Sequence, residues 1–241
     1  MIDTLLFDLD GTLLPLDIEI FTLKYFNELC NKFESIFEPR VLQEAVWAST
    51  KYMICNTQKE KTNKDCFFED FQTRIERNLE ELFPIFDEFY NKDFVNLKDS
   101  VNPNPVVKES IEILKDKGYN LVVATNPLFP KEAIFHRIDW AGLNADDFKL
   151  ITTYENMHYC KPNIQYYEEI LELINKKPDN VMMVGNDVQE DIISSKLGLK
   201  TFLIEDCLID RKSPVYIPDY RGSISDFYEF VNELPRLKNK C

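Results

Sequence analysis

Glycine, basic residues and long hydrophobic runs are scarce in this sequence of 241 residues. It contains 6 glycines, and 28 Lys and Arg residues against 42 Asp and Glu residues, for a formal net charge of −14. A surface with this excess of negative charge repels phosphate backbones and anionic lipid, so we expect no nucleic-acid partner and no membrane partner. The sequence has no run of about 18 apolar residues, which argues against a membrane-spanning helix.

The cysteines form no CxxC pair and no cluster with the spacing of metal ligands. The six are Cys30, Cys55, Cys66, Cys160, Cys207 and Cys241. Unpaired thiols in this pattern are typical of a reducing compartment. The N-terminal residues lack the basic stretch and the small-residue cleavage site of a signal peptide. We therefore expect a cytoplasmic protein that is a monomer or a weak dimer.

The longest stretch without glycine, residues 12–117, is rich in aromatic residues at helical spacing. Phe21, Tyr25 and Leu29 would share one helical face, and Phe67 and Phe71 would share another. This spacing predicts an all-helical unit over residues 15–99.

Outside that unit, short apolar runs alternate with helical patterns. The runs predict strands over residues 4–8, 120–126, 148–153, 180–185 and 200–204. The patterns between and beside them predict helices over residues 106–117, 130–140, 164–175 and 187–196. Buried strands that alternate with helices indicate an α/β fold with a doubly wound parallel sheet. We therefore predict a Rossmann-like core from residues 1–14 and 100–241, an inserted helical domain from 15–99, and hinges near 14–17 and 99–105.

Polar residues follow the predicted strands at the points where ligands bind in open parallel sheets. The first strand runs into Asp8, Asp10, Gly11 and Thr12, in the sequence DLDGT. An acidic turn or helix cap is the simpler interpretation of two carboxylates at this position. An apolar run followed by DxDGT is too specific for a generic turn, so we predict that both carboxylates are functional.

Two further positions are weaker signals when each is taken alone. Thr125 and Asn126 follow the second strand and could bind an oxyanion or simply cap the next helix. Lys161 precedes Pro162 at a helix start and could be an ordinary solvated charge.

The fourth predicted strand ends in the sequence GNDVQED, which contains Asn186, Asp187 and Asp191. Acidic residues at a helix start could merely complement the helix dipole. Together with Asp8 and Asp10, they also match a site for a hard cation, because Mg²⁺ prefers oxygen ligands.

These four motifs, in this order, resemble the haloacid dehalogenase-like (HAD) hydrolase superfamily. The resemblance covers essentially the whole chain, at residues 8–12, 125–126, 161–162 and 185–191. It is closest to phosphatase-type members with a helical cap inserted after the first motif. The resemblance implies a HAD-type core, a cap over residues 15–99 and a small phosphorylated metabolite as the substrate.

The resemblance also implies a role for each motif residue. Asp8 would be the nucleophile that forms an aspartyl-phosphate, and Asp10 would protonate the leaving oxygen and then activate water. Thr125 and Lys161 would be catalytic through binding of the phosphoryl group, and Asn126 would contribute to phosphate binding. Members of the family that cleave carbon–halogen bonds generally lack the second aspartate, which favours a phosphatase here.

The implied cofactor is Mg²⁺, held by the Asp8 side chain, the backbone carbonyl of Asp10 and a residue of the fourth motif. The family usually has Asp directly after the glycine, where this chain has Asn186 followed by Asp187. Either residue could be the ligand. Asp191 would then lie behind the ligands, orienting a metal-bound water or Lys161.

The leading functional hypothesis is therefore a Mg²⁺-dependent phosphatase of small phosphate monoesters. A phosphomutase of the same family, or a catalytically silent protein that binds metal or phosphate, are the alternatives. Trp47 and Trp140 are expected to be packing residues. The lysines of the inserted unit could meet an anionic substrate, but we expect them to be solvated charges; they are Lys51, Lys59, Lys61 and Lys64.

Overall fold

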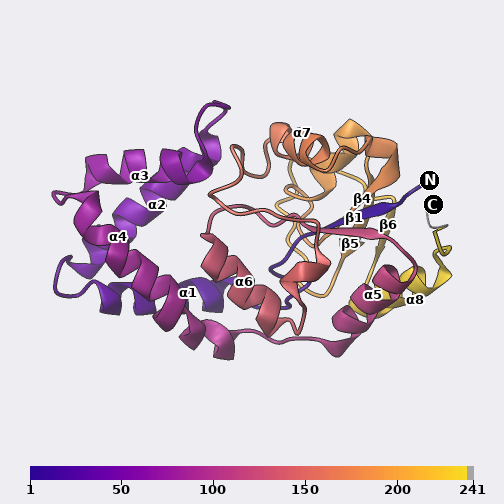
Figure 1. Cartoon of the computed structure of the whole chain (residues 1–241), viewed down its shortest axis with the longest axis horizontal. Coiled ribbons are helices and arrows are strands. Elements are labelled where there is room, and N and C mark those ends of the chain that lie inside the picture. The colour runs from indigo at the N-terminus through magenta and orange to yellow at the C-terminus, as the bar shows by residue number, and fades with distance from the viewer. Residues whose placement is uncertain (238–241) are drawn as a thin grey trace.

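Six parallel strands form the sheet on which the candidate site is built (Figure 1). The computed structural model describes residues 1–237. The strand order is β3-β2-β1-β4-β5-β6. The strands are β1 (Thr4–Phe7), β2 (Asn120–Val123), β3 (Leu150–Ile151), β4 (Val181–Gly185), β5 (Lys200–Ile204) and β6 (Tyr220–Gly222). The central strands β1 and β4 are buried along their whole length, as their uninterrupted apolar sequences require.

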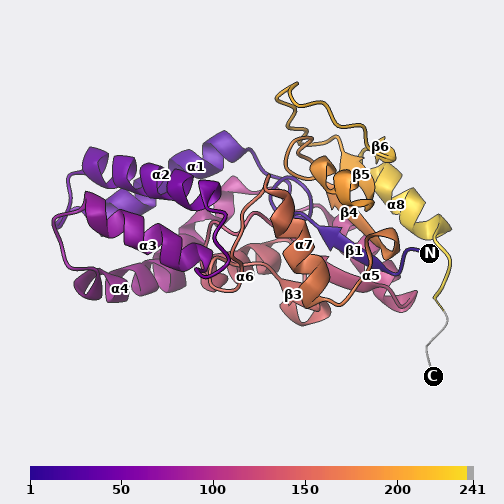
Figure 2. The same ribbon diagram turned by 90° about the horizontal axis from the view of Figure 1, so that it is seen from above.

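Helices cover both faces of this sheet. Helices α5 (Pro105–Asp116) and α8 (Ile224–Glu233) pack together on one face, and α7 (Ile164–Leu173) lies on the opposite face (Figure 1). Helix α6 (Lys131–Trp140) lies between the sheet and the inserted helices (Figures 1 and 2). The predicted α/β fold with a doubly wound parallel sheet is therefore confirmed.

The inserted segment contains helices and no strand. It comprises α1 (Ile18–Lys32), α2 (Pro39–Cys55), α3 (Asn63–Arg74), α4 (Leu79–Glu88), the π-helical turn η1 (Phe89–Asp93) and the 3₁₀ helix η2 (Phe94–Ser100). Local sequence starts these helices: the Asp17 carboxylate caps α1, and Thr62 with Asp65 forms a capping box at α3. The helices stand to one side of the sheet and extend away from it (Figure 2).

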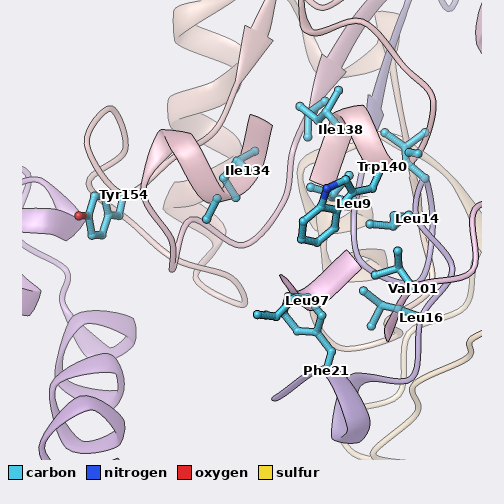
Figure 3. Close-up of a cluster of buried hydrophobic side chains, with 14 of the residues drawn as sticks. Leu9, Leu14, Leu16, Phe21, Leu97, Val101, Ile134, Ile138, Trp140 and Tyr154 are labelled. Atoms are coloured by element: carbon cyan, nitrogen blue, oxygen red, sulfur yellow. The ribbon is translucent and has the colours of Figure 1, made fainter. Parts of the chain in front are cut away.

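The two chain passages that join the insertion to the sheet run side by side. Leu16 and Val101 form an antiparallel bridge, and the Asn102 backbone N–H donates to the Pro15 carbonyl at 2.8 Å. A buried apolar cluster continues from the sheet into the insertion and includes Leu14, Leu16, Leu97, Val101 and Trp140 (Figure 3). The insertion is thus packed against the sheet domain as well as tethered to it.

The structure departs from the sequence prediction at three places. In place of the helix predicted over 187–196, the chain forms a tight turn, in which the Asp187 side chain accepts from the Gln189 and Glu190 backbone N–H groups, followed by a short 3₁₀ helix, η5 (Ile192–Leu197). The strand predicted over 148–153 pairs only at β3. Strand β6 and helix α8 were not predicted, since β6 is a short and mostly exposed edge strand.

Two further expectations concern the cysteines and membrane-spanning helices, and both bear on the described residues. Within residues 1–237 the five cysteines are all free, and Cys241 lies outside the described residues. Over the same residues, no helix has the length and apolarity needed to cross a membrane.

Candidate active site

The motif residues meet because the strands that carry them are in register. Phe7 on β1 is level with Val123 on β2 and with Val184 on β4. The residues that follow these positions therefore emerge together at the carboxyl edge of the sheet, where ligands bind in this class of fold. They open onto a cavity of about 380 Å³, whose polar end is lined by Asp8, Asp10, Thr125, Asn126, Asn186, Asp187, Glu190 and Asp191.

A buried lysine joins the first and fourth motifs. Lys161 Nζ donates to Asp8 Oδ1 at 2.8 Å and to Asp191 Oδ1 at 2.6 Å. Burial lowers the pKa of Lys161, but the charges of Asp191 and Asp8 outweigh this effect and hold it well above its usual value. Lys161 is therefore a fixed cation at the strand ends. The second oxygen of Asp8, Oδ2, accepts no hydrogen bond from residues 1–237.

Two glycines create the space that this arrangement needs. Gly185 ends β4, and a Cβ atom there would lie 2.1 Å from Asp191 Oδ2. Gly11 has a positive φ of 88°, and a Cβ atom there would lie 2.4 Å from the Asn186 side-chain nitrogen. Gly11 thus allows the first and fourth motifs to approach each other closely, and Gly185 leaves room for the Asp191 carboxylate within the fourth motif.

Asp10 forms a buried ion pair that the sequence analysis did not predict. Arg137 of α6 donates from Nη1 to Asp10 Oδ2 and from Nε to the Ala133 carbonyl, the latter at 3.1 Å. Burial and the neighbouring Asp8 raise the pKa of Asp10, whereas the Arg137 charge opposes that rise. Asp10 Oδ1 is buried and has no hydrogen-bond partner within the described part of the chain.

Thr125 and Asn126 have different surroundings. The Thr125 backbone carbonyl accepts hydrogen bonds from Thr152 and Tyr166, while its hydroxyl donates to no residue in 1–237. The Asn126 side chain is engaged on both sides: Oδ1 accepts from the Lys161 backbone N–H at 3.2 Å, and Nδ2 donates to Glu190 Oε2 at 3.0 Å. Thr125 can therefore present a donor to a ligand, whereas the Asn126 side chain positions the Lys161 segment.

The fourth motif places two candidate metal ligands in unlike environments. Asn186 Oδ1 accepts from the Thr12 hydroxyl at 2.9 Å, and Asn186 Nδ2 donates to the Cys207 carbonyl at 2.7 Å. Asp187 Oδ1 accepts from the Gln189 and Glu190 backbone N–H groups, both at 2.9 Å, and Arg211 donates to both carboxylate oxygens of Asp187, at 2.7 and 2.6 Å. Both carboxylate and amide line the cavity, and the Asp187 carboxylate is the more fully engaged of the two groups.

Negative charge exceeds positive charge around this site. Three cations, Lys161, Arg137 and Arg211, pair with five carboxylates, a formal charge of −2; the carboxylates are Asp8, Asp10, Asp187, Glu190 and Asp191. Burial, with a smaller effect of the Asp187 charge, raises the pKa of Glu190 to about 7.

The donor set suits a divalent cation with oxygen ligands. At the cavity it offers the free oxygen of Asp8, the Asp10 backbone carbonyl, and the side-chain oxygens of Asn186 and Asp187. Among residues 1–237, no three acidic, histidine or cysteine side chains converge to form a complete metal cage. That pattern fits Mg²⁺, which commonly uses one or two carboxylates and keeps several waters.

The motif residues singled out from the sequence all lie at this one edge of the sheet, but Arg137, Glu190 and Arg211 were missed. Arg137 had a detectable signal: it falls on the apolar face of its helix, shared with Ala133 and Ile134, where a charged residue needs a partner. Glu190 lies inside the GNDVQED motif. Arg211 lies in a loop, and no periodic pattern marks it.

Comparison with known proteins gives consistent results along the chain. The family model described as haloacid dehalogenase-like hydrolase matches residues 2–197. The pyrophosphatase PpaX of Bacillus cereus is 22% identical over 237 residues, 98% of this chain and 99% of that protein. A glyceraldehyde 3-phosphate phosphatase of Methanothermobacter thermautotrophicus is 29% identical over 125 residues, 52% of each chain.

Solved structures share the fold over nearly the whole length. A HAD phosphatase from Thermococcus onnurineus has a TM-score of 0.60 at 19% identity and covers 98% of this chain and 100% of its own. The magnesium-bound HAD hydrolase YfnB from Bacillus subtilis has a TM-score of 0.56 at 20% identity, covering 96% and 99%. With the family model matching most of the chain, and the four motifs gathered at the carboxyl edge of the sheet, this protein belongs to the haloacid dehalogenase-like hydrolase family.

Proposed function

We propose that this hydrolase is a Mg²⁺-dependent phosphatase that hydrolyses a small phosphate monoester through an aspartyl-phosphate. The observation that carries the proposal is the carboxylate of Asp8: one oxygen is held by Lys161 at 2.8 Å, and the other is free at a cavity that Asp10 also lines. A fixed nucleophile beside a second carboxylate is the arrangement that such a two-step displacement needs.

In the first step, the free oxygen of Asp8 attacks phosphorus and the ester oxygen leaves. Lys161 stays on the other oxygen of Asp8 and offsets negative charge on the transferred group. The Thr125 hydroxyl is free to donate to a phosphoryl oxygen. Because the Asn126 side chain is bonded to the Lys161 segment, we assign any phosphate contact of Asn126 to its backbone N–H.

Asp10 carries the proton in both steps. Its raised pKa suits an acid that protonates the leaving oxygen, and its carboxylate then takes a proton from the water that hydrolyses the aspartyl-phosphate. Arg137 positions this carboxyl from behind. A halide leaving group needs no such proton, so the presence of Asp10 favours ester hydrolysis over dehalogenation.

Mg²⁺ would be held by the Asp8 carboxylate, the Asp10 backbone carbonyl and one residue of the fourth motif, either Asn186 through Oδ1, which accepts from Thr12, or Asp187, whose carboxylate is paired with Arg211. When bound, it would neutralise charge on the phosphoryl group and on the surrounding carboxylates. Asp191 is bonded to Lys161 and the Asp187 backbone, so we give it the supporting role of fixing both residues.

We propose that residues 15–99 act as a cap that excludes water from the cavity, moving about residues 14–17 and 99–105. The bridge between Leu16 and Val101 ties these two passages together, so they would bend as one hinge. The Bacillus subtilis relative YfnB shows movement between its domains.

Phosphate release is the test of this proposal. We expect the purified chain to release phosphate from small monoesters with Mg²⁺, and to lose that activity with EDTA and regain it when Mg²⁺ is restored. Transfer of phosphate between two positions of a sugar, faster than its release, would instead identify a phosphomutase. Mg²⁺ binding without turnover of any ester would identify a silent binding protein.

A further inference from the structure

The cavity has two chemically different ends. The sheet end carries the carboxylates described above, and the other end is lined by residues of α1 to α4 and of η1. These inserted helices stand beside the sheet in Figure 2. Aromatic rings dominate this second end, among them Tyr25, Phe26, Trp47, Phe68, Phe86 and Tyr90. A phosphate ester bound at Asp8 would extend its leaving group into this aromatic end.

Among the described residues, those that the insertion contributes to the cavity include no charged side chain. Two of its lysines are engaged elsewhere, Lys59 with Glu172 and Lys61 with Glu69. Of the cavity-lining residues within 1–237, Arg211 alone is a cation; it lies at the sheet end and is bound to Asp187 and Glu190. A second anionic group on the substrate would therefore face rings and carboxylates without a counter-charge.

The insertion does supply a neutral polar group. The hydroxyls of Tyr25 and Tyr90 lie 2.9 Å apart at the cavity. Burial raises the pKa of Tyr25 to about 12 and that of Tyr90 well above its usual value, so both remain uncharged near neutral pH. This pair can bond a hydroxyl, ether or carbonyl oxygen of a leaving group, but it offers no positive charge.

Trp47 shows that the aromatic end is not filled by the protein itself. Its side chain lies on α2, tilted against Phe26 with ring centroids 5.2 Å apart, and it remains 51% exposed while it lines the cavity. The expectation that Trp47 is only a packing residue therefore does not describe its place. A ring with one packed face and one open face suits a flat apolar ligand.

We propose that the leaving group of the substrate is an uncharged alcohol or phenol with an aromatic or extended apolar body. This inference rests on the proposed phosphatase activity and names its substrate class. It sets this chain apart from enzymes whose substrates carry a second anion next to the scissile bond, such as pyrophosphate or a phosphorylated carboxylic acid.

The test compares esters whose leaving groups are all primary alcohols, so that differences reflect the pocket. We would measure kcat/KM of the full chain with Mg²⁺ for 2-phenylethyl phosphate, glycerol 3-phosphate and 3-phosphoglycerate, and for pyrophosphate as a dianionic leaving group. We expect 2-phenylethyl phosphate to exceed each of the others by at least about tenfold. Equal or higher values for 3-phosphoglycerate or pyrophosphate would overturn this inference and leave the phosphatase proposal standing. Phosphate release from none of the compounds would overturn the phosphatase proposal itself.

Variants on α2 test whether the aromatic end of the cavity binds the leaving group. Trp47→Ala should raise KM for 2-phenylethyl phosphate several-fold with little change in kcat, and should leave glycerol 3-phosphate unaffected. Tyr52→Ala is the matched control, because Tyr52 is on the same helix, is 50% exposed and does not line the cavity. Thr50→Lys places a cation in the lining and should shift kcat/KM toward 3-phosphoglycerate. If Trp47→Ala affected both esters alike, or Thr50→Lys left the ratio unchanged, the aromatic end would not be the leaving-group site.

Discussion

Removing Arg137 should destabilise the folded protein more than the loss of any exposed ion pair. Its side chain is 1% exposed, and the Asp10 side chain with which it pairs is 18% exposed. Its guanidinium also lies 4.6 Å from the centre of the Phe129 ring. Arg137→Met would leave the Asp10 carboxylate buried without its counter-charge, a change that costs about 3–5 kcal/mol in comparable pairs. That is a large fraction of the roughly 5–15 kcal/mol by which domains are usually stable.

Urea unfolding at neutral pH, followed by circular dichroism, measures this cost directly. The double variant Arg137→Met with Asp10→Asn should recover at least half of the loss, because the uncompensated charge is gone. Arg236→Met is the matched control, since Arg236 pairs with Asp116 at 2.6 Å where the two side chains are 64% and 72% exposed; it should cost under about 1 kcal/mol. A loss below about 1 kcal/mol for Arg137→Met, or a double variant no more stable than the single one, would refute the reasoning.

Three further changes probe other parts of the site and fold. Lys161→Met should lower kcat by at least about 10²-fold, because the cation beside Asp8 is lost; activity within tenfold of wild type would contradict that role. Asp187→Asn should weaken Mg²⁺ binding measured by calorimetry, whereas an unchanged affinity would point to Asn186 as the ligand. Burial raises the pKa of Asp219, but hydrogen bonds from Lys200 and Thr201 outweigh it and hold the pKa below its usual value. Its stabilising effect should therefore be complete above about pH 4 and lost as the pH falls further, and Asp219→Asn should flatten the acid limb of a plot of Tm against pH.

The strand ends could be predicted from sequence because burial and chain direction dictate them. A run such as Thr4–Phe7, apolar on both faces, must be an inner strand, and in a parallel sheet every such strand delivers its next residue to the same edge. The glycines of the motifs follow from the same geometry, since a side chain at Gly11 would collide with Asn186 of the fourth motif, and one at Gly185 would collide with Asp191. This is why Asp8, Thr125 and the fourth motif could be placed together without coordinates.

The other features of the site depend on contacts with side chains that local sequence does not specify. Arg137 meets Asp10 across 127 positions of sequence, and the apolar pattern of its helix indicates burial but names no partner. The stretch after Gly185 carries a helical pattern, but the side chains of Asp187 and Asp191 bond to the backbone of the turn and to Lys161, and only Ile192–Leu197 form a short 3₁₀ helix. Local helix propensity predicts neither the Arg137–Asp10 pair nor the side-chain hydrogen bonds of this turn.

The sequence also did not show which aromatic residues line the cavity. Helical spacing predicted that aromatic residues of the insertion would share helix faces, and in the structure most of them are buried. It did not distinguish rings that fill the insertion, such as Phe71 and Phe89, from those that face the site, such as Phe86 and Tyr90. That distinction depends on how the inserted helices pack against one another and against the sheet domain, which the sequence of a single helix does not determine.

The central claim is that Asp8 becomes phosphorylated, and trapping of the phosphoenzyme tests it most directly. The full chain with Mg²⁺ would be mixed with 4-nitrophenyl phosphate, quenched in acid within one turnover and digested for mass spectrometry. The account predicts phosphate on the peptide that contains Asp8, none in Asp8→Asn, and an increased amount in Asp10→Asn, because hydrolysis of the intermediate needs the proton transfer that contributes about 10²–10⁴-fold. Phosphate release at the wild-type rate by Asp8→Asn, or phosphate on another residue in the wild-type chain, would contradict it.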